Sequence, residues 1–211
     1  MKIFIALLTV AFLIGCGSGD KSETEQTSPA ETPALEISDG FTPGESIMPL
    51  AEGNLWNYQI SAYDTVALGM VPTSVDSFKV LGDTVLGEET WYFVVGLGPN
   101  RGTVRNRDDG FWFIRPGEEP FLFAKYPAVP GEEYRNQISG TDVYNRVEET
   151  SVEITVPAGK FVCFKYRQIV GAKRMTTDYY FSPGNGLVKT DIHSPSGGYM
   201  IFTAELMDKN F

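Results

Sequence analysis

The sequence predicts an all-β protein, an antiparallel meander of long strands that forms a curved sandwich or a half-open barrel. Three observations lead to this prediction. Apolar and polar residues alternate with period two in several stretches, turn-forming residues separate these stretches, and no amphipathic helical pattern follows the N-terminal segment. We therefore expect about ten or eleven strands joined by tight turns.

The N-terminus reads as an export signal. Lys2 precedes an apolar run from Ile3 to Ile14, which is too short for the roughly 20 residues that a membrane-spanning helix needs. The run ends in Leu13-Ile14-Gly15-Cys16, which has the form of a lipobox. We expect residues 1–15 to be a lipoprotein signal peptide, cleaved between Gly15 and Cys16, and Cys16 to carry palmitate and other acyl chains that anchor the protein. The alternatives are an ordinary secretory peptide or an N-terminal core helix.

Residues 16–46 are expected to be the lipidated cysteine followed by a disordered acidic tether. This stretch is rich in Ser, Thr, Glu and Pro, has Phe41 as its one aromatic residue, and lacks apolar periodicity. Its acidic residues face Lys21 alone and are Asp20, Glu23, Glu25, Glu31, Glu36, Asp39 and Glu45. A partner-binding segment or a sorting signal is the alternative. The whole chain has a net charge of -10, which argues against nucleic acid and anionic lipid as partners.

Residues 47–211 have the length of a single domain, and the alternation predicts its strands in order. The clearest are Trp56–Ala62, Asp142–Val156 and Met200–Leu206, and a weaker pattern covers Phe78–Val80. The strand Asp142–Val156 would be about 14 residues long, well beyond the usual five or six, which suits a strongly curved sheet.

Turn chemistry falls between the expected strands. Turns are predicted at Asp108-Asp109-Gly110, Val156-Pro157-Ala158-Gly159, Ser182-Pro183-Gly184-Asn185 and Pro195-Ser196-Gly197-Gly198. In the second, Gly159 can take a left-handed conformation that closes a hairpin. In the third, Pro183-Gly184 suits a type II turn, whose second central residue needs a positive φ.

Two of these turns lie in a recognisable context. The chain contains Val156-Pro157-Ala158-Gly159-Lys160-Phe161 and, further on, Tyr180-Phe181-Ser182-Pro183-Gly184-Asn185-Gly186-Leu187-Val188-Lys189. Together they resemble the paired signature of a broad group of uncharacterised bacterial envelope lipoproteins, and Pro49–Tyr58 looks like that group's first strand. The resemblance implies a half-barrel similar in shape to periplasmic lipoprotein carriers, and it implies no catalytic residues. Unlike those carriers, this chain has no evident lid helices.

Three segments are apolar on both strand faces and interrupt the alternation: residues 91–95, 111–114 and 121–124. Such strands are either covered on both sides or have one face free for a ligand. The candidate surface for a lipid, acyl chain, peptide or partner protein comprises Trp91, Phe93, Phe111, Trp112, Phe113, Phe121 and Phe123. The alternative is a central sheet packed on both faces.

An arginine cluster is the second candidate site. Arg101, Arg105, Arg107 and Arg115 lie within fifteen residues of an acidic chain. Arg105 and Arg107 share a face of an extended strand, and guanidinium groups match carboxylate and phosphate. We expect either docking of an anion or a solvated face balanced by Asp108, Asp109, Glu118 and Glu119.

Catalytic and metal chemistry find little support. His193 is the single histidine, which excludes sites built from several histidines. Once Cys16 is acylated, Cys163 has no disulfide partner, and we expect it to be a small buried hydrophobe, with a reactive thiol as the alternative. No cofactor or metal is expected.

The sequence therefore predicts a non-enzymatic binding or carrier module for an apolar ligand or partner. It would be lipid-anchored in a bacterial cell envelope, at the outer membrane, on its periplasmic or its surface face. A structural or assembly accessory of the envelope is the alternative. A glycan or cell-wall hydrolase using converging carboxylates is a third possibility.

Overall fold

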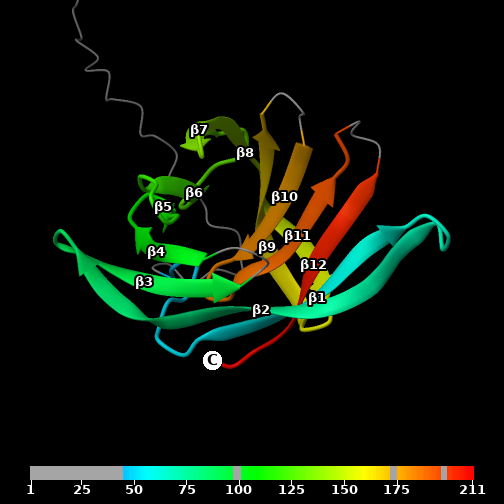
Figure 1. The fold of residues 1–211 in the computed structure, drawn as a ribbon, viewed down its shortest axis with the longest axis horizontal. Coiled ribbons are helices and arrows are strands. Elements are labelled where there is room, and N and C mark those ends of the chain that lie inside the picture. Colours follow the sequence, from blue (N-terminus) through cyan, green and yellow to red (C-terminus); the bar gives the residue numbers. More distant parts are fainter. Residues whose placement is uncertain (1–44, 97–100, 172–174, 196–198) are drawn as a thin grey trace, which may run out of the picture. The chain divides into compact units, whose positions relative to one another are not determined.

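The computed structural model describes residues 45–96, 101–171, 175–195 and 199–211, and within them the chain forms twelve strands and no helix (Figure 1). This confirms the predicted all-β class, with more strands than expected. The strands are β1 Leu55–Asp64, β2 Gly69–Leu86, β3 Glu89–Gly96, β4 Arg101–Arg107, β5 Gly110–Ile114, β6 Phe121–Lys125, β7 Glu133–Ile138, β8 Thr141–Val156, β9 Gly159–Val170, β10 Met175–Ser182, β11 Gly186–His193 and β12 Met200–Lys209.

All twelve strands belong to one antiparallel sheet in the order β6-β5-β4-β3-β2-β1-β12-β11-β10-β9-β8-β7. Every neighbouring pair is consecutive in the chain except β1 and β12, the first and last strands. Their pairing places Tyr58 opposite Leu206 and Ala62 opposite Phe202. The sheet curls into a nearly closed barrel, which is the half-open barrel of the prediction and not the two-layer sandwich.

The remaining gap lies between the edge strands β6 and β7, and side chains close it. The Tyr134 hydroxyl donates to the Phe123 carbonyl oxygen at 2.9 Å, and the Asn136 amide donates to the Leu122 oxygen at 2.8 Å. Tyr166 of β9 donates to the Lys125 oxygen at 2.6 Å. These bonds satisfy backbone carbonyls of β6 that an open edge would leave unpaired.

Aromatic rings fill the interior of the barrel. Phe123 lies 5.0 Å from Tyr179, 6.0 Å from Phe111 and 6.1 Å from Phe181, measured between ring centroids. Buried Tyr58 satisfies its hydroxyl by donating to the Leu187 carbonyl oxygen at 2.8 Å. The period-two alternation thus supplies a densely packed core on one side of the sheet.

The long strand and its turns follow the prediction. β8 has 16 residues and runs through Asp142–Val156. Its hairpin with β9 reaches back to β12, where the Ala158 amide donates to the Leu206 oxygen at 2.9 Å. Gly159 has a φ of 130° and Gly184 a φ of 71°, so both take the left-handed conformations expected of them. A turn also joins β4 to β5 at Asp108-Asp109.

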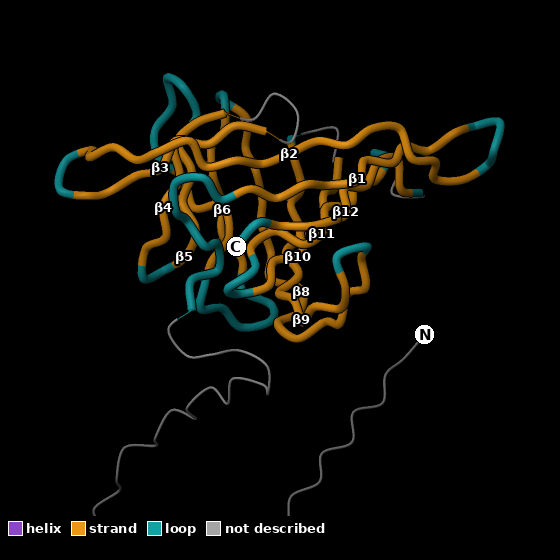
Figure 2. Tube along the Cα trace, turned by 90° about the horizontal axis from the view of Figure 1, so that it is seen from below, coloured by secondary structure: helices purple, strands orange, loops and turns teal. Residues whose placement is uncertain are grey.

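Two hairpins, β1–β2 and β2–β3, project from the sheet in opposite directions (Figures 1 and 2). Both use β2, which at 18 residues is the longest described strand. Ahead of β1, Ile47 and Met48 are buried in the core, and the Ser46 oxygen accepts the Gly184 amide at 2.9 Å.

Several expectations fall outside the described residues: the signal peptide, the cleavage site at Gly15 and Cys16, the acidic tether as far as residue 44, and most of the turn at 195–198.

Candidate functional site

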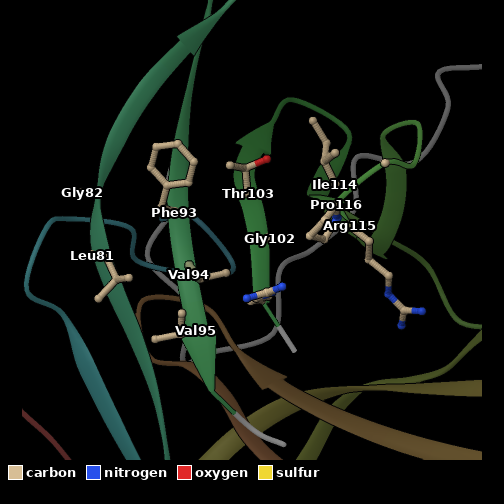
Figure 3. A pocket seen from close by; sticks show the side chains of 12 residues that line it. Leu81, Gly82, Phe93, Val94, Val95, Gly102, Thr103, Ile114, Arg115 and Pro116 are labelled. Carbon is tan, nitrogen blue, oxygen red and sulfur yellow. The ribbon is translucent and has the colours of Figure 1, made fainter. Parts of the chain in front are cut away.

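An open groove with a volume of about 540 Å³ lies on the outer side of β2–β5, opposite the core (Figure 3). Phe93 stands opposite Gly82 of β2 and Thr103 of β4, and Thr103 stands opposite Ile114 of β5. This register places the side chains of Phe93, Thr103 and Ile114 in one row across β3, β4 and β5, next to the bare backbone of Gly82 on β2. Leu81 and Val95 extend the row, and Pro116 closes one side.

The groove leaves large apolar side chains open to water. Leu81 is 49% exposed, Phe93 47% and Val95 37%. A bulge in the β2–β3 pairing between Val80 and Gly82 directs Leu81 to this side. On β3 the opposite face is equally apolar, with Val94 buried in the core. The strand is therefore apolar on both faces because one face packs inward and the other lines the groove.

Beside the groove, two arginines stack on two tryptophans. Trp91 is buried, yet it lies outside the core cluster, under the guanidinium carbons of Arg105 at 5.8 Å and Arg107 at 5.3 Å from its ring centroid. Arg107 also lies 4.4 Å from the ring centroid of Trp112. Cation–π contacts of this kind fix the guanidinium planes against the sheet.

Glu89 binds both arginines of this stack. Arg107 binds it with two of its three nitrogens, Nε to Oε1 at 3.1 Å and Nη2 to Oε2 at 2.6 Å, and Arg105 Nη1 lies 3.1 Å from Oε1. The hydrogen bond from Arg107 holds the pKa of Glu89 below its ordinary value, and the charge of Arg105 adds to the effect. A second recess of about 360 Å³ borders these three residues.

The four predicted arginines thus divide into two pairs. Arg105 and Arg107 share a face as expected, but the acid that pairs with both is Glu89 of β3 and not one of the four acids considered from the sequence. Asp109 instead accepts the Trp112 indole N–H at 2.7 Å.

Arg101 and Arg115 lie at the groove itself, and neither has an acidic partner among the described residues. Arg101 stands opposite Val95 at the start of β4. Arg115 follows β5, its guanidinium carbon lies 5.8 Å from the ring centroid of Phe121, and its side chain extends away from the groove floor (Figure 3). Two uncompensated positive charges in an acidic chain favour an anionic group on whatever occupies the groove.

The seven predicted apolar residues also divide between the two sides of the sheet. Trp91, Phe93 and Trp112 face outward, together with the arginines. The other four, Phe111, Phe113, Phe121 and Phe123, face the interior and pack against one another and the core. The structure therefore places Phe93 in the groove, Trp91 and Trp112 in the arginine stack beside it, and the other four rings in the barrel core.

The structure contains one polar cluster that was not predicted from the sequence. Asp178 of β10 is 3% exposed at its side chain and accepts two hydrogen bonds from Arg167 of β9, both at 2.8 Å. Lys165 Nζ and His193 Nε2 each lie 3.5 Å from Asp178 Oδ2. Polar residues at alternate positions of β9, β10 and β11 were the available signal. The cluster includes His193, the single histidine of the sequence.

The other candidates have plain environments. Cys163 is a free, buried thiol, and burial raises its pKa to about 12. Within the described ranges, no group of three or more His, Cys, Asp or Glu side chains is placed to hold a metal ion. Nor does any described segment form a helix long and apolar enough to cross a membrane.

No protein-family model and no curated protein matches the sequence. Solved structures with a similar fold include two bacterial proteins. One is a Bacteroides fragilis protein described as a candidate exported protein with a YmcC-like fold, with a TM-score of 0.51 and 13% identity, covering 79% of this chain and all of the other. The second is a candidate lipoprotein of Parabacteroides distasonis, with a TM-score of 0.51 and 18% identity over 79% of this chain and 99% of the other. At these identities the likeness concerns the fold.

Proposed function

We propose that the protein is a lipid-anchored envelope protein that acts without catalysis, by holding an apolar, acidic segment of another envelope protein in the groove on β2–β5. The observation that carries this proposal is the exposure of Leu81, Phe93 and Val95 beside Arg101 and Arg115, which pair with no acid in the described part of the chain. Exposed apolar patches of this kind, bordered by polar residues, are typical of interaction sites.

The position of the groove favours docking over carriage. A carrier holds its cargo in a cavity, whereas the barrel interior is occupied by the chain's own rings, among them Phe111, Phe123 and Phe181. The apolar surface that remains free lies outside the barrel. This supports a binding module whose partner is a protein, and it also agrees with the alternative of an assembly accessory of the envelope.

The proposed localisation of the protein rests on its N-terminal sequence and not on the groove. The lipobox ending at Cys16 supports cleavage, acylation with palmitate and outer-membrane anchoring. The sequence's likeness to envelope lipoproteins and the descriptions of the two structural neighbours agree with export. The domain would lie on the same side of the outer membrane, periplasmic or surface, as the partner that it holds.

Native mass spectrometry of the mature protein, extracted gently from its envelope, tests the proposal. We expect a chain that begins at Cys16 and carries its lipid, in complex with a second polypeptide. Phe93→Asp and Arg101→Glu should abolish the complex, whereas Val75→Asp, at an exposed valine of β2 outside the groove, should leave it intact. A bound small ligand that survives Phe93→Asp would contradict the groove as the binding site.

A further inference from the structure

The tip of the β1–β2 hairpin, residues 64–70, carries a second exposed apolar surface, far from the groove along β2 (Figure 2). Val66 is 91% exposed and Leu68 76% exposed, the highest values for large apolar side chains in the described residues. Neither side chain contributes to the core. Because the two lie together on one hairpin tip, they form an apolar surface that the fold itself does not require.

The tip is held in a defined shape. Asp64 Oδ1 accepts hydrogen bonds from the backbone amides of Val66 and Ala67, both at 2.7 Å, while Asp64 pairs with Gly69 across the hairpin. Below the tip, the rings of Tyr63 and Tyr199 pack with centroids 5.2 Å apart. The apolar side chains are thus presented outward by a braced turn.

The conformation of Leu68 strengthens the case. Its φ is 53°, in the left-handed region that glycine and asparagine occupy far more readily than a residue with a branched side chain. Leucine at this position is unfavourable for the backbone and, since it is exposed, unfavourable in water as well. A residue that is costly on both counts marks a functional position.

The chemistry of the tip points to lipid as its partner. The one charged residue from Asp64 to Val75 is Asp64 itself, whose carboxylate is bound by the amides of Val66 and Ala67, and Asp76 lies beyond this stretch. The tip is convex, so a protein partner would need a matching cavity, whereas a bilayer deforms around it. Tyr63 and Tyr199 at the base are suited to the level of the lipid headgroups. Because the chain is acidic and the tip has no lysine or arginine, the lipid would be neutral.

We propose that the β1–β2 tip inserts Val66 and Leu68 into the surface of a neutral lipid bilayer. This contact is separate from the groove and independent of its partner. Combined with an N-terminal anchor, a second point of attachment would restrict how the barrel is oriented on the membrane, because the two attachments act together.

The test uses the lipidated full-length protein reconstituted in phosphatidylcholine vesicles. A tryptophan is introduced as Val66→Trp at this tip or, as the matched control, as Val85→Trp at the β2–β3 tip, where Val85 is also exposed. Lipids brominated along their acyl chains then quench tryptophan that enters the bilayer. We expect quenching about threefold or more stronger for Val66→Trp than for Val85→Trp.

A further substitution separates contact from folding. In the Val66→Trp background, Leu68→Asn suits the left-handed backbone, so the midpoint of urea unfolding should be unchanged or higher while quenching falls by about half or more. Equal quenching at the two tips, absence of quenching at Val66→Trp, or quenching that Leu68→Asn leaves unchanged would each overturn the proposal.

Discussion

Replacing Asp178 by asparagine should be among the most destabilising single changes in the barrel. The carboxylate is 3% exposed and faces Arg167 at 2.8 Å, with Lys165 and His193 at 3.5 Å. An amide of the same shape cannot balance these groups, so the positive charges remain close together without a counterion. Breaking a buried ion pair typically costs about 3–5 kcal/mol. Because the Arg167 side chain is more than a third exposed, water solvates part of its charge, and we expect about 2–3 kcal/mol.

The effect should also depend on pH in a defined direction. Burial alone would raise the pKa of Asp178, but hydrogen bonds from Arg167 and the charges of Lys165 and Arg167 outweigh burial and hold the pKa below its ordinary value of 3.8. A depressed pKa means that the stabilisation is fully present above the ordinary value. It is lost as the pH falls below that value towards the pKa of the folded protein. The difference between wild type and Asp178→Asn should therefore persist from pH 7 to pH 5 and shrink below about pH 4.

Urea unfolding of the full-length protein in a mild non-ionic detergent measures this difference. For a barrel of this size, the loss corresponds to a fall in the thermal midpoint of about 4–12 °C. Asp142→Asn, at an exposed position of β8, is the matched control and should change stability by less than about 0.5 kcal/mol. A loss below about 0.5 kcal/mol for Asp178→Asn, or a loss that grows on acidification below pH 4, would refute the reasoning.

Two further predictions concern the barrel's seam and its buried thiol. Tyr134→Phe removes the hydrogen bond to the Phe123 oxygen that helps to close the seam, and it should cost about 1 kcal/mol in urea unfolding, whereas Tyr144→Phe on the exposed side of β8 should cost little. An equal effect of the two changes would contradict the role of the seam. Burial raises the pKa of Cys163 to about 12, so its thiol should resist iodoacetamide at pH 8 in the folded protein and react in urea. Peptide mass spectrometry identifies the labelled cysteine, and rapid labelling of the folded state would contradict the burial of Cys163.

The sequence predicted what depends on local patterning. Period-two alternation gave the all-β class, the length of β8 followed from its unbroken pattern, and Pro183-Gly184 and Gly159 marked their turns because few residues tolerate a positive φ. The shared face of Arg105 and Arg107 followed from strand geometry alone.

Features that depend on closure of the sheet could not be predicted in this way. Phe111 and Trp112 are adjacent and equally apolar, and only the curl of β5 with β6 towards β7 decides which of them points inward. The bulge at Val80–Gly82 sets the register between β2 and β3 and brings Leu81 into the groove. Glu89 lies 18 residues before Arg107, and its part in the arginine stack emerges once β3 and β4 pair.

Photo-crosslinking in intact cells tests most directly the central claim that the outer side of the sheet, and not its interior, is the binding surface. A photoreactive benzoylphenylalanine is placed at Phe93, on the outer side of β3, or at Phe123, whose ring lies inside the barrel. The account predicts a discrete adduct with a second envelope protein from Phe93, lost on Arg101→Glu, and only internal crosslinks from Phe123. An adduct with a lipid or other ligand from Phe123, with none from Phe93, would contradict it.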